Sequence, residues 1–440
     1  MRKDMLDLAH GAIRTALASG AGACSATVSN DRRVEISYRE RKPETIKEAS
    51  TRDLLIRLYV EGRYSAQSTS DVRPDALKRF IADAVQMTRL LAEDPARTLP
   101  DSKYYEDRQT MDLGLVDPQQ QRLAAAERHQ LVQAAEAACL AGGGAQVVSV
   151  TSGWTDGRSE DLLVTSNGFE GYSEGTYFVQ SVQLTLQDEG DRRPNGYAVA
   201  VATQKADLPR AEAVGMEALR RTRALLGSRK IKTETLPVII ENRNVPQVLG
   251  VLLDAMSGRA VQQKQSFLAD KKGQKIGSDL LTLIDDPFVP RGLGSQLYDS
   301  EGMTARRRTM VEAGVLKEFY VDWYYSRKLG WEPTTGGPSN LILPSGKRSV
   351  SEIKKDLGRG ILVTGFIGGN SNPTTGDGSI GIVGHLFENG ENVQAIAEMN
   401  IAANALDLFG RLIEVANDPW PYSRYRTPSI AFRDVVVSGI

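Results

Sequence analysis

The chain has 440 residues, of which 41% are hydrophobic and 25% charged, and its 54 basic residues nearly balance 55 acidic ones. This length predicts two or three domains, and the near-neutral charge excludes a protein built mainly to bind nucleic acid or a membrane surface. With two cysteines, an amphipathic rather than apolar beginning and no apolar run that would cross a bilayer, we expect a reduced cytoplasmic protein.

The beginning of the chain predicts helices and strands in mixture. Apolar spacing indicates a helix over 5–18, and alternation indicates strands around 34–38 and 56–60. Pro74 suits the first turn of a second helix. Its expected buried face is Leu77, Phe80, Ala84, Met87 and Leu91.

The middle of the chain continues the same mixture up to a charged segment. A long helix is predicted over 118–141, where three glycines end it, and another over 209–226. Between them, β-rich stretches predict the strands 146–152, 160–166, 177–187 and 197–203. The charged stretch 228–234 predicts a domain break. The expected domains are an N-terminal α/β domain over 1–227, with sub-regions of about 1–95 and 116–227, and a β-rich domain over 234–440.

The second half is predicted to be mainly strands joined by glycine-rich turns, which makes the fold class α+β. Strands are expected at 236–240, 361–367 and 435–437, with hairpin turns at 312–314 and 389–390. The glycine- and asparagine-rich segment 368–377 is expected to be an irregular loop, and 401–415 a helix.

Histidine and cysteine are too scattered to predict a catalytic centre. His10, His129 and His385 have no second histidine within helical or hairpin reach, so a zinc site of this chain's own is not expected. Cys24 and Cys139 fit small buried residues better than nucleophiles. Neither a serine-nucleophile elbow nor a phosphate-binding glycine loop is present.

Two charged groups are candidate binding sites. Asp285 and Asp286 are adjacent acids, but neighbours on a strand point to opposite faces and Pro287 follows, which favours a turn with one capping aspartate. The run Arg306–Arg308 contains phosphate-binding side chains, yet exposed charges at a strand start are commoner.

Several short motifs occur in order along nearly the whole chain. The longest is 362–377, LVTGFIGGNSNPTTGD. The others in this half are 283–286, 299–302, 312–316, 388–390 and 397–400, and the first half contributes 58–63 and 68–71. Together they resemble the TldD/PmbA family, and their number and order make the resemblance specific.

The resemblance implies a two-subunit cytoplasmic metalloprotease with an antiparallel, barrel-like C-terminal sheet. A TldD-like subunit carries His-Glu-x-x-x-His on a helix, and the TldE/PmbA-type subunit lacks it. Here Asp254 and Arg259 stand at the two histidine positions, Ala255 at the glutamate, and the helix is expected over about 246–262. The region 418–428, where the catalytic subunit has a cysteine ligand, has no cysteine. The resemblance therefore implies that the zinc belongs to a TldD-like partner, and no cofactor is expected in this chain.

The implied role is proteolytic processing of peptides or small unfolded proteins; an older family name is modulator of DNA gyrase. The expected partners are a TldD-like chain or a second copy, and an extended peptide. Cavity-lining candidates are Asn370, Ser371, Asn372, Thr374 and Thr375, although a loop needing unusual backbone angles explains the same residues. A self-sufficient peptidase with an unidentified site and a homodimeric peptide-binding module stay open as alternatives.

Overall fold

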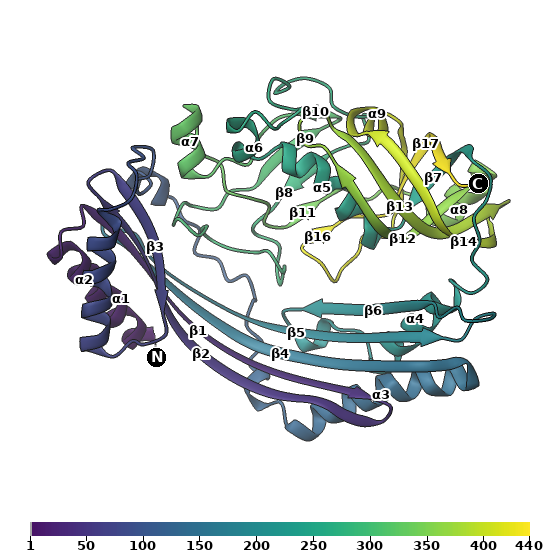
Figure 1. The fold of residues 1–440 in the computed structure, drawn as a ribbon, viewed down its shortest axis with the longest axis horizontal. Coiled ribbons are helices and arrows are strands. Elements are labelled where there is room, and N and C mark those ends of the chain that lie inside the picture. The colour runs from purple at the N-terminus through teal and green to yellow at the C-terminus, as the bar shows by residue number, and fades with distance from the viewer. Residues whose placement is uncertain (1) are drawn as a thin grey trace.

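The first half of the protein is built on one antiparallel sheet, seen in the computed structural model, which describes residues 2–440. Its six strands lie in the order β3-β2-β1-β4-β5-β6. They are β1 (Ala23–Arg39), β2 (Lys42–Val60), β3 (Arg63–Thr69), β4 (Val147–Thr165), β5 (Glu170–Leu186) and β6 (Asn195–Ala202). The sheet bends into an arc with the helices on its outer side (Figure 1): α1 (Arg2–Ala18), α2 (Pro74–Thr88), α3 (Ala125–Gly143) and α4 (Ala211–Arg223).

The two faces of this sheet differ in chemistry. Ala26 and Val28 of β1 are fully buried among residues of α1 and α2, and Ile36 packs with Val132 of α3. Side chains alternate along a strand, so the residues between these buried ones lie on the inner face. Thr27, between Ala26 and Val28, lines a cavity there and does not pack against a helix. Apolar side chains are therefore concentrated on the helix-bearing face, and Leu55 and Leu163 are apolar residues of the inner face.

The C-terminal part is a five-stranded barrel. The strands follow the order β14-β13-β12-β7-β17, and a short pairing between β14 and β17 closes them. They are β7 (Glu234–Ile240), β12 (Arg359–Ser371), β13 (Asp377–Glu388), β14 (Glu391–Asn404) and β17 (Ile430–Ser438), with β15 (Leu412–Val415) paired to β17. β12 and β7 run parallel, so the barrel is mixed.

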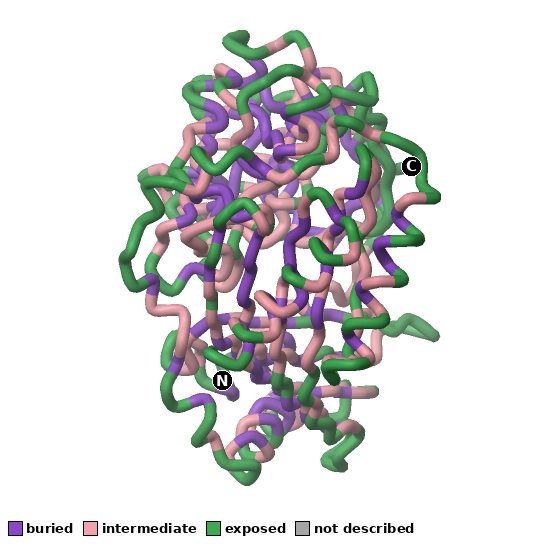
Figure 2. The backbone as a smooth tube through the Cα atoms, turned by 90° about the vertical axis from the view of Figure 1, so that its left-hand side faces the viewer, coloured by how far each residue is buried: buried purple, intermediate pink, exposed green. Residues whose placement is uncertain are grey.

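A smaller sheet and five helices pack against the barrel. The sheet has the order β10-β9-β8-β11-β16, from β8 (Leu283–Asp285), β9 (Arg308–Glu312), β10 (Val315–Leu316), β11 (Leu341–Ile342) and β16 (Tyr425–Arg426). The helices are α5 (Val245–Ala255), α6 (Gly258–Gln262), α7 (Trp323–Leu329), α8 (Val350–Leu357) and α9 (Ala405–Gly410). One large hydrophobic cluster joins the barrel, the small sheet, α5 and α9, and Ile353 of α8 packs with Phe387 of β13 in a second cluster. Figure 2 shows buried segments enclosed by exposed ones.

The α+β class, with mixed or antiparallel strands expected in the first half, and the C-terminal barrel-like sheet are confirmed, but one detail differs from expectation. The C-terminal sheet is mixed rather than antiparallel, because β12 and β7 run parallel. The Asn389 turn is confirmed, with φ of 50° at Asn389 and 91° at Gly390. The segment 228–234 lies between α4 and β7, and the domain boundaries stay a prediction. Among residues 2–440 no helix has the length and apolar character of a membrane span.

The separate strands predicted at 146–152 and 160–166 are wrong, because β4 is continuous over both. The glycines between the two predicted strands do not form a turn, and they allow neighbouring side chains to approach the strand closely. A Cβ on Gly157 would lie 2.5 Å from the Tyr177 ring of β5. Its neighbour Asp156 is polar yet fully buried, which also breaks the apolar alternation.

Two helix predictions also need correction. On α2 the buried face is Leu77, Ile81, Ala84 and Val85, whereas Met87 is 57% exposed and Leu91 lies beyond the helix end. The helix expected over 401–415 is only α9, because β14 continues to Asn404 and β15 begins at Leu412. Ile401 pairs with Ile380 of β13, and this non-local partner overrides the local helix propensity.

A buried ion pair ties α3 to the middle of the sheet. The Asp156 carboxylate is fully buried and accepts hydrogen bonds from Arg128 Nε at 2.5 Å and Nη2 at 2.8 Å. Gln120 Nε2 and Trp154 Nε1 each donate to it at 2.8 Å. The charge is therefore paired and its oxygens are satisfied.

We expect Arg128→Met to destabilise the protein strongly, because it leaves the Asp156 charge buried without its cation. Breaking such a pair costs roughly 3–5 kcal/mol, which lowers a melting temperature by roughly 6 °C or more. The control is Arg32→Met, which removes the exposed pair with Glu48 and changes stability by less than about 1 kcal/mol. Equal melting temperatures for the two variants, measured by calorimetry, would contradict this account.

Carboxyl groups also lie where the first sheet meets the C-terminal part. Glu301 and Tyr324 of α7 share a small cavity with Arg57 and Tyr59 of β2. Glu301 Oε2 accepts a hydrogen bond from the Trp323 backbone N–H at 2.9 Å. Burial, followed by the Asp299 and Asp322 carboxylates, raises the pKa of Glu301 from 4.5 to about 7.

The contribution of Glu301 to stability should therefore fall as pH rises from 4.5 to 7, because the unfolded chain loses the Glu301 proton first while the folded chain retains it. Glu301→Gln is neutral at every pH, so we expect a melting temperature above that of the wild type at pH 8 and a smaller difference at pH 5. Burial also raises the pKa of Asp299 to about 6, so part of the pH dependence of stability should remain in this variant. Exposed Glu189→Gln is the control. A pH profile unchanged by Glu301→Gln would refute the assignment.

Candidate functional site

The positions of the degenerate metal motif lie on two helices rather than on one. α5 ends at Ala255 and α6 begins at Gly258, so the continuous helix expected over 246–262 is wrong. Ser257 caps α6 by accepting a hydrogen bond from Ala260 N–H at 3.2 Å. This local cap satisfies a backbone donor that a continuous helix would have used internally.

The side chains at these positions do not fit a metal ion. Asp254 and Arg259 are exposed, Ala255 is fully buried, and no hydrogen bond joins the side chains of the first two in the described chain. A guanidinium keeps its charge and repels a cation, and a methyl group cannot accept a proton. Within residues 2–440, no three His, Cys, Asp or Glu residues form a group that could hold a metal.

The three histidines lie in three different environments. His10 is 3.3 Å from Glu170 at the surface, and His129 Nδ1 is 3.0 Å from the Tyr38 hydroxyl. His385 is buried on β13, with Nε2 2.8 Å from the Ala224 carbonyl oxygen, and burial lowers its pKa. The structure thus does not bring them together.

The other sequence candidates are structural groups. Asp285 is buried and accepts the Ser339 backbone N–H at 2.8 Å, while Asp286 accepts the Phe288 N–H at 2.9 Å and caps the turn, as predicted. Arg306 and Arg307 are exposed, and Arg308 is half-buried. Cys24 and Cys139 are free and buried, and burial raises the pKa of each thiol to about 12. Neither thiol is a nucleophile at neutral pH.

The segment expected as an irregular loop is half strand. β12 continues to Ser371 across a bulge at Gly368 and Gly369, whose φ values are 65° and 131°, so only 372–376 is a turn. Asn372 Oδ1 accepts the Thr374 N–H at 2.9 Å, and Thr375 Oγ1 donates to Asp377 at 2.7 Å. These hydrogen bonds stabilise the turn.

A cavity of about 400 Å³ opens at this end of the barrel. Asn370 and Ser371 line it, whereas Asn372, Thr374 and Thr375 lie on the exposed turn beyond it. Its walls come from α5, α9 and the five barrel strands. The apolar lining is Val238, Ile240, Val248, Val251, Phe366, Ile380, Ile401, Ala403, Ala405, Leu408, Phe409, Phe432 and Val435.

The helix that bears the motif positions also forms a wall of this cavity. Gln247 and Val251 line the cavity, and Asp254 follows them at the helical spacing that keeps residues on one face. Asp254 therefore extends the cavity-lining stripe of α5 to its exposed end. Arg259, on the next helix, lies outside this stripe.

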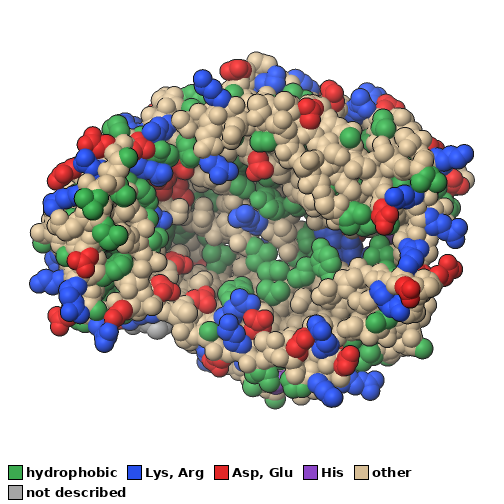
Figure 3. Space-filling model, in the orientation of Figure 1, with side chains coloured by type: hydrophobic (Ala, Val, Ile, Leu, Met, Phe, Trp, Pro, Cys, Tyr) green, Lys and Arg blue, Asp and Glu red, His purple; other side chains and the backbone are tan. Residues whose placement is uncertain are grey.

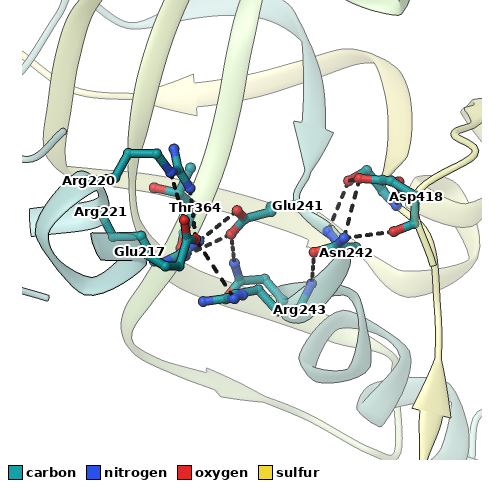
Figure 4. Close-up of polar contacts among 10 residues, drawn as sticks. Glu217, Arg220, Arg221, Glu241, Asn242, Arg243, Thr364 and Asp418 are labelled. Atoms are coloured by element: carbon teal, nitrogen blue, oxygen red, sulfur yellow. Dashed lines mark hydrogen bonds and ion pairs between the residues drawn. The ribbon is translucent and has the colours of Figure 1, made fainter. Parts of the chain in front are cut away.

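An ion-pair network fixes where α5 begins (Figure 4). Arg221 of α4 donates to both oxygens of Glu241, at 2.7 and 2.8 Å, and to the Thr364 carbonyl oxygen at 3.0 Å. The next residue, Asn242, donates from Nδ2 to the Asp418 carbonyl oxygen at 2.7 Å. The network thus joins the first half, the end of β7 and the segment after β15.

A second hollow lies over the inner face of the first sheet. Figure 3 shows the molecule hollowed between the sheet and the C-terminal part, and a cavity of about 660 Å³ lies there. Thr27, Asp161 and Ser173 line it from the sheet, and Tyr298 from the C-terminal part. Its lining is more polar than that of the barrel cavity.

Sequence reasoning missed the open edge of β12. Only Ile361, Leu362 and Val363 pair with β7, because the chain leaves the barrel after Ile240. Within the described chain, 364–371 has β13 on one side and no strand on the other. The absence of charge and proline in 364–371 was a readable signal for such an edge, since exposed edges normally carry them.

Domain families match most of the chain. Residues 24–88 match domain 1, 119–226 the central domain and 233–439 the C-terminal domain of the PmbA/TldA metallopeptidases. Metalloprotease PmbA of Escherichia coli O157:H7 is 29% identical over 97% of this chain and 95% of its own length. The Haemophilus influenzae PmbA homologue is 27% identical over 96% of this chain and 94% of its own.

Solved structures agree with these relatives. A Bacteroides thetaiotaomicron protein described as a modulator of DNA gyrase is 34% identical, with a TM-score of 0.96 over 99% of this chain and 98% of its own. TldE from Thermococcus kodakarensis shares the fold at 22% identity, with a TM-score of 0.85 over 98% of this chain and 99% of its own. These matches confirm the resemblance drawn from the motifs. The chain belongs to the PmbA/TldD metallopeptidase family, and it is a member of the PmbA/TldE type.

Proposed function

We propose that this chain is the non-catalytic subunit that completes a TldD-like metalloprotease. One observation carries the proposal. The positions that the sequence aligns with a zinc motif hold Asp254, Ala255 and Arg259, a set that cannot bind a catalytic zinc, in a chain whose relatives are called metalloproteases. In this proposal the zinc and its water belong to the partner.

The substrate side of the proposal rests on the barrel. An open strand edge offers main-chain N–H and C=O groups to an extended chain, and such recognition tolerates many sequences. The β12 edge at 365–371 has this form, beyond the Thr364 carbonyl that Arg221 already binds, and Asn370 and Ser371 link it to the barrel cavity. We therefore propose extended peptides or unfolded segments of small proteins as substrates of the assembled enzyme.

The two alternatives have weaker support. A self-sufficient peptidase needs a nucleophile and base, or a metal group, and the described residues offer two buried thiols and three separated histidines. A homodimeric peptide-binding module would use the same open edge without a catalytic partner. The presence of a TldD-like partner distinguishes this module from the favoured function.

The first test is complementation. Alone, the chain should contain no stoichiometric zinc by elemental analysis and should not cleave unstructured peptides. Mixed with a TldD-like chain that carries His-Glu-x-x-x-His, it should form a heterodimer by light scattering, burying roughly 1,200–2,000 Å² or more, and support cleavage that a chelator stops. About one tightly bound zinc per isolated chain, or chelator-resistant cleavage by it, would refute the non-catalytic assignment.

The second test rebuilds the motif. We expect Asp254→His, Ala255→Glu and Arg259→His together to give no efficient enzyme, because 418–428 still lacks a cysteine ligand. Supporting hydrogen bonds around a metal are missing too, and their loss alone costs roughly 10–100-fold in affinity or activity. Zinc affinity by competition with a chelating dye, and peptide cleavage, are the measurements. Full activity of the triple variant would show that the remaining scaffold is complete.

A further inference from the structure

The barrel cavity has an apolar interior and a polar mouth. Phe409 and Phe432 form part of its buried wall, and Val251 of α5 and Ala403 of β14 line it from two other sides. At the mouth are Gln247 and Asn370, whose side chains make no hydrogen bond to another described residue. No Asp, Glu, Lys or Arg of the described chain lines the cavity.

These features define what the cavity accepts. A cavity of about 150 Å³ already binds benzene, so about 400 Å³ holds an aromatic or large aliphatic side chain with room to spare. A charged side chain would lose its hydration without finding a partner there, which makes its entry costly. A free fatty acid would bring a carboxylate to a mouth that has no cation.

The neighbouring strand edge identifies the occupant. Phe366, Gly368 and Asn370 belong both to the cavity lining and to the β12 segment that has no strand on its outer side. A strand added at that edge turns every second side chain toward the same face. An extended peptide held there can therefore direct a side chain into the cavity while its main chain meets the free edge.

We propose that the barrel cavity is a specificity pocket for one bulky apolar side chain, such as Phe or Leu, of an extended peptide bound at the β12 edge. This inference rests on the proposed function and names the class of peptide that the assembled enzyme prefers. Selectivity comes from burying apolar surface, whereas the edge contributes affinity that is independent of sequence.

The experiment measures peptide binding by the full chain without a partner. The probes are fluorescein-labelled octapeptides of Gly, Ser and Thr with one central Phe, Leu or Ala, and the readout is fluorescence anisotropy. We expect the Phe and Leu peptides to bind roughly 10- to 100-fold more tightly than the Ala peptide. Val251→Trp, which fills the cavity from α5, should remove this preference, so that the three peptides bind with equal affinity.

Two further variants make the result decisive. Ala403→Phe fills the cavity from β14 and repeats the test if Val251→Trp fails to fold. Val393→Trp makes the matched change on the same barrel strand, at a position that is 53% exposed, and should retain the preference. Circular dichroism checks that each variant is folded.

Three results would overturn the proposal. Equal affinities for the three peptides, no binding of any of them, or a preference that survives both cavity-filling variants would each show that the cavity does not select the side chain. Binding of decanoate without binding of the Phe peptide would assign the cavity to an alkyl chain instead. These failures are separate from failure of the subunit assignment, which shows as the absence of a heterodimer or of cleavage with a TldD-like chain.

Discussion

The ion pair between Arg221 and Glu241 is the contact on which the arrangement of the two halves depends. Glu241 follows β7 directly, and its backbone N–H donates to the Val363 carbonyl oxygen at 3.0 Å. Held by Arg221 from the first half, Glu241 marks the point where the chain leaves the barrel and turns into α5. This departure ends the pairing of β7 with β12, and it therefore creates both the open edge and a wall of the cavity.

The two halves contribute different surfaces to one molecule. The first sheet has its apolar side chains on the outer face under four helices, which leaves a polar inner face toward the hollow. The barrel has the opposite character at its open end, where an apolar cavity lies beside uncharged strand residues.

The positions around the degenerate metal motif differ in how tightly the fold constrains them. A Cβ added to Gly258 would lie 3.1 Å from the Cβ of Tyr325, so the close packing at this position favours glycine. Asp254 and Arg259 are exposed and carry no such constraint. Exposed positions accept new charges at little cost in stability, whereas buried close approaches do not.

The sequence alone determined the fold class, the hairpin at Asn389, the chain's long helices and the family, because these follow from local periodicity, turn chemistry and ordered motifs. Only the tertiary structure decided the rest. β4 is one strand because Gly157 lies under the Tyr177 ring, and Ile401 is in a strand because Ile380 pairs with it. The cavity, the open edge and the Arg221 contact join residues far apart in sequence, and no local pattern encodes which distant groups meet.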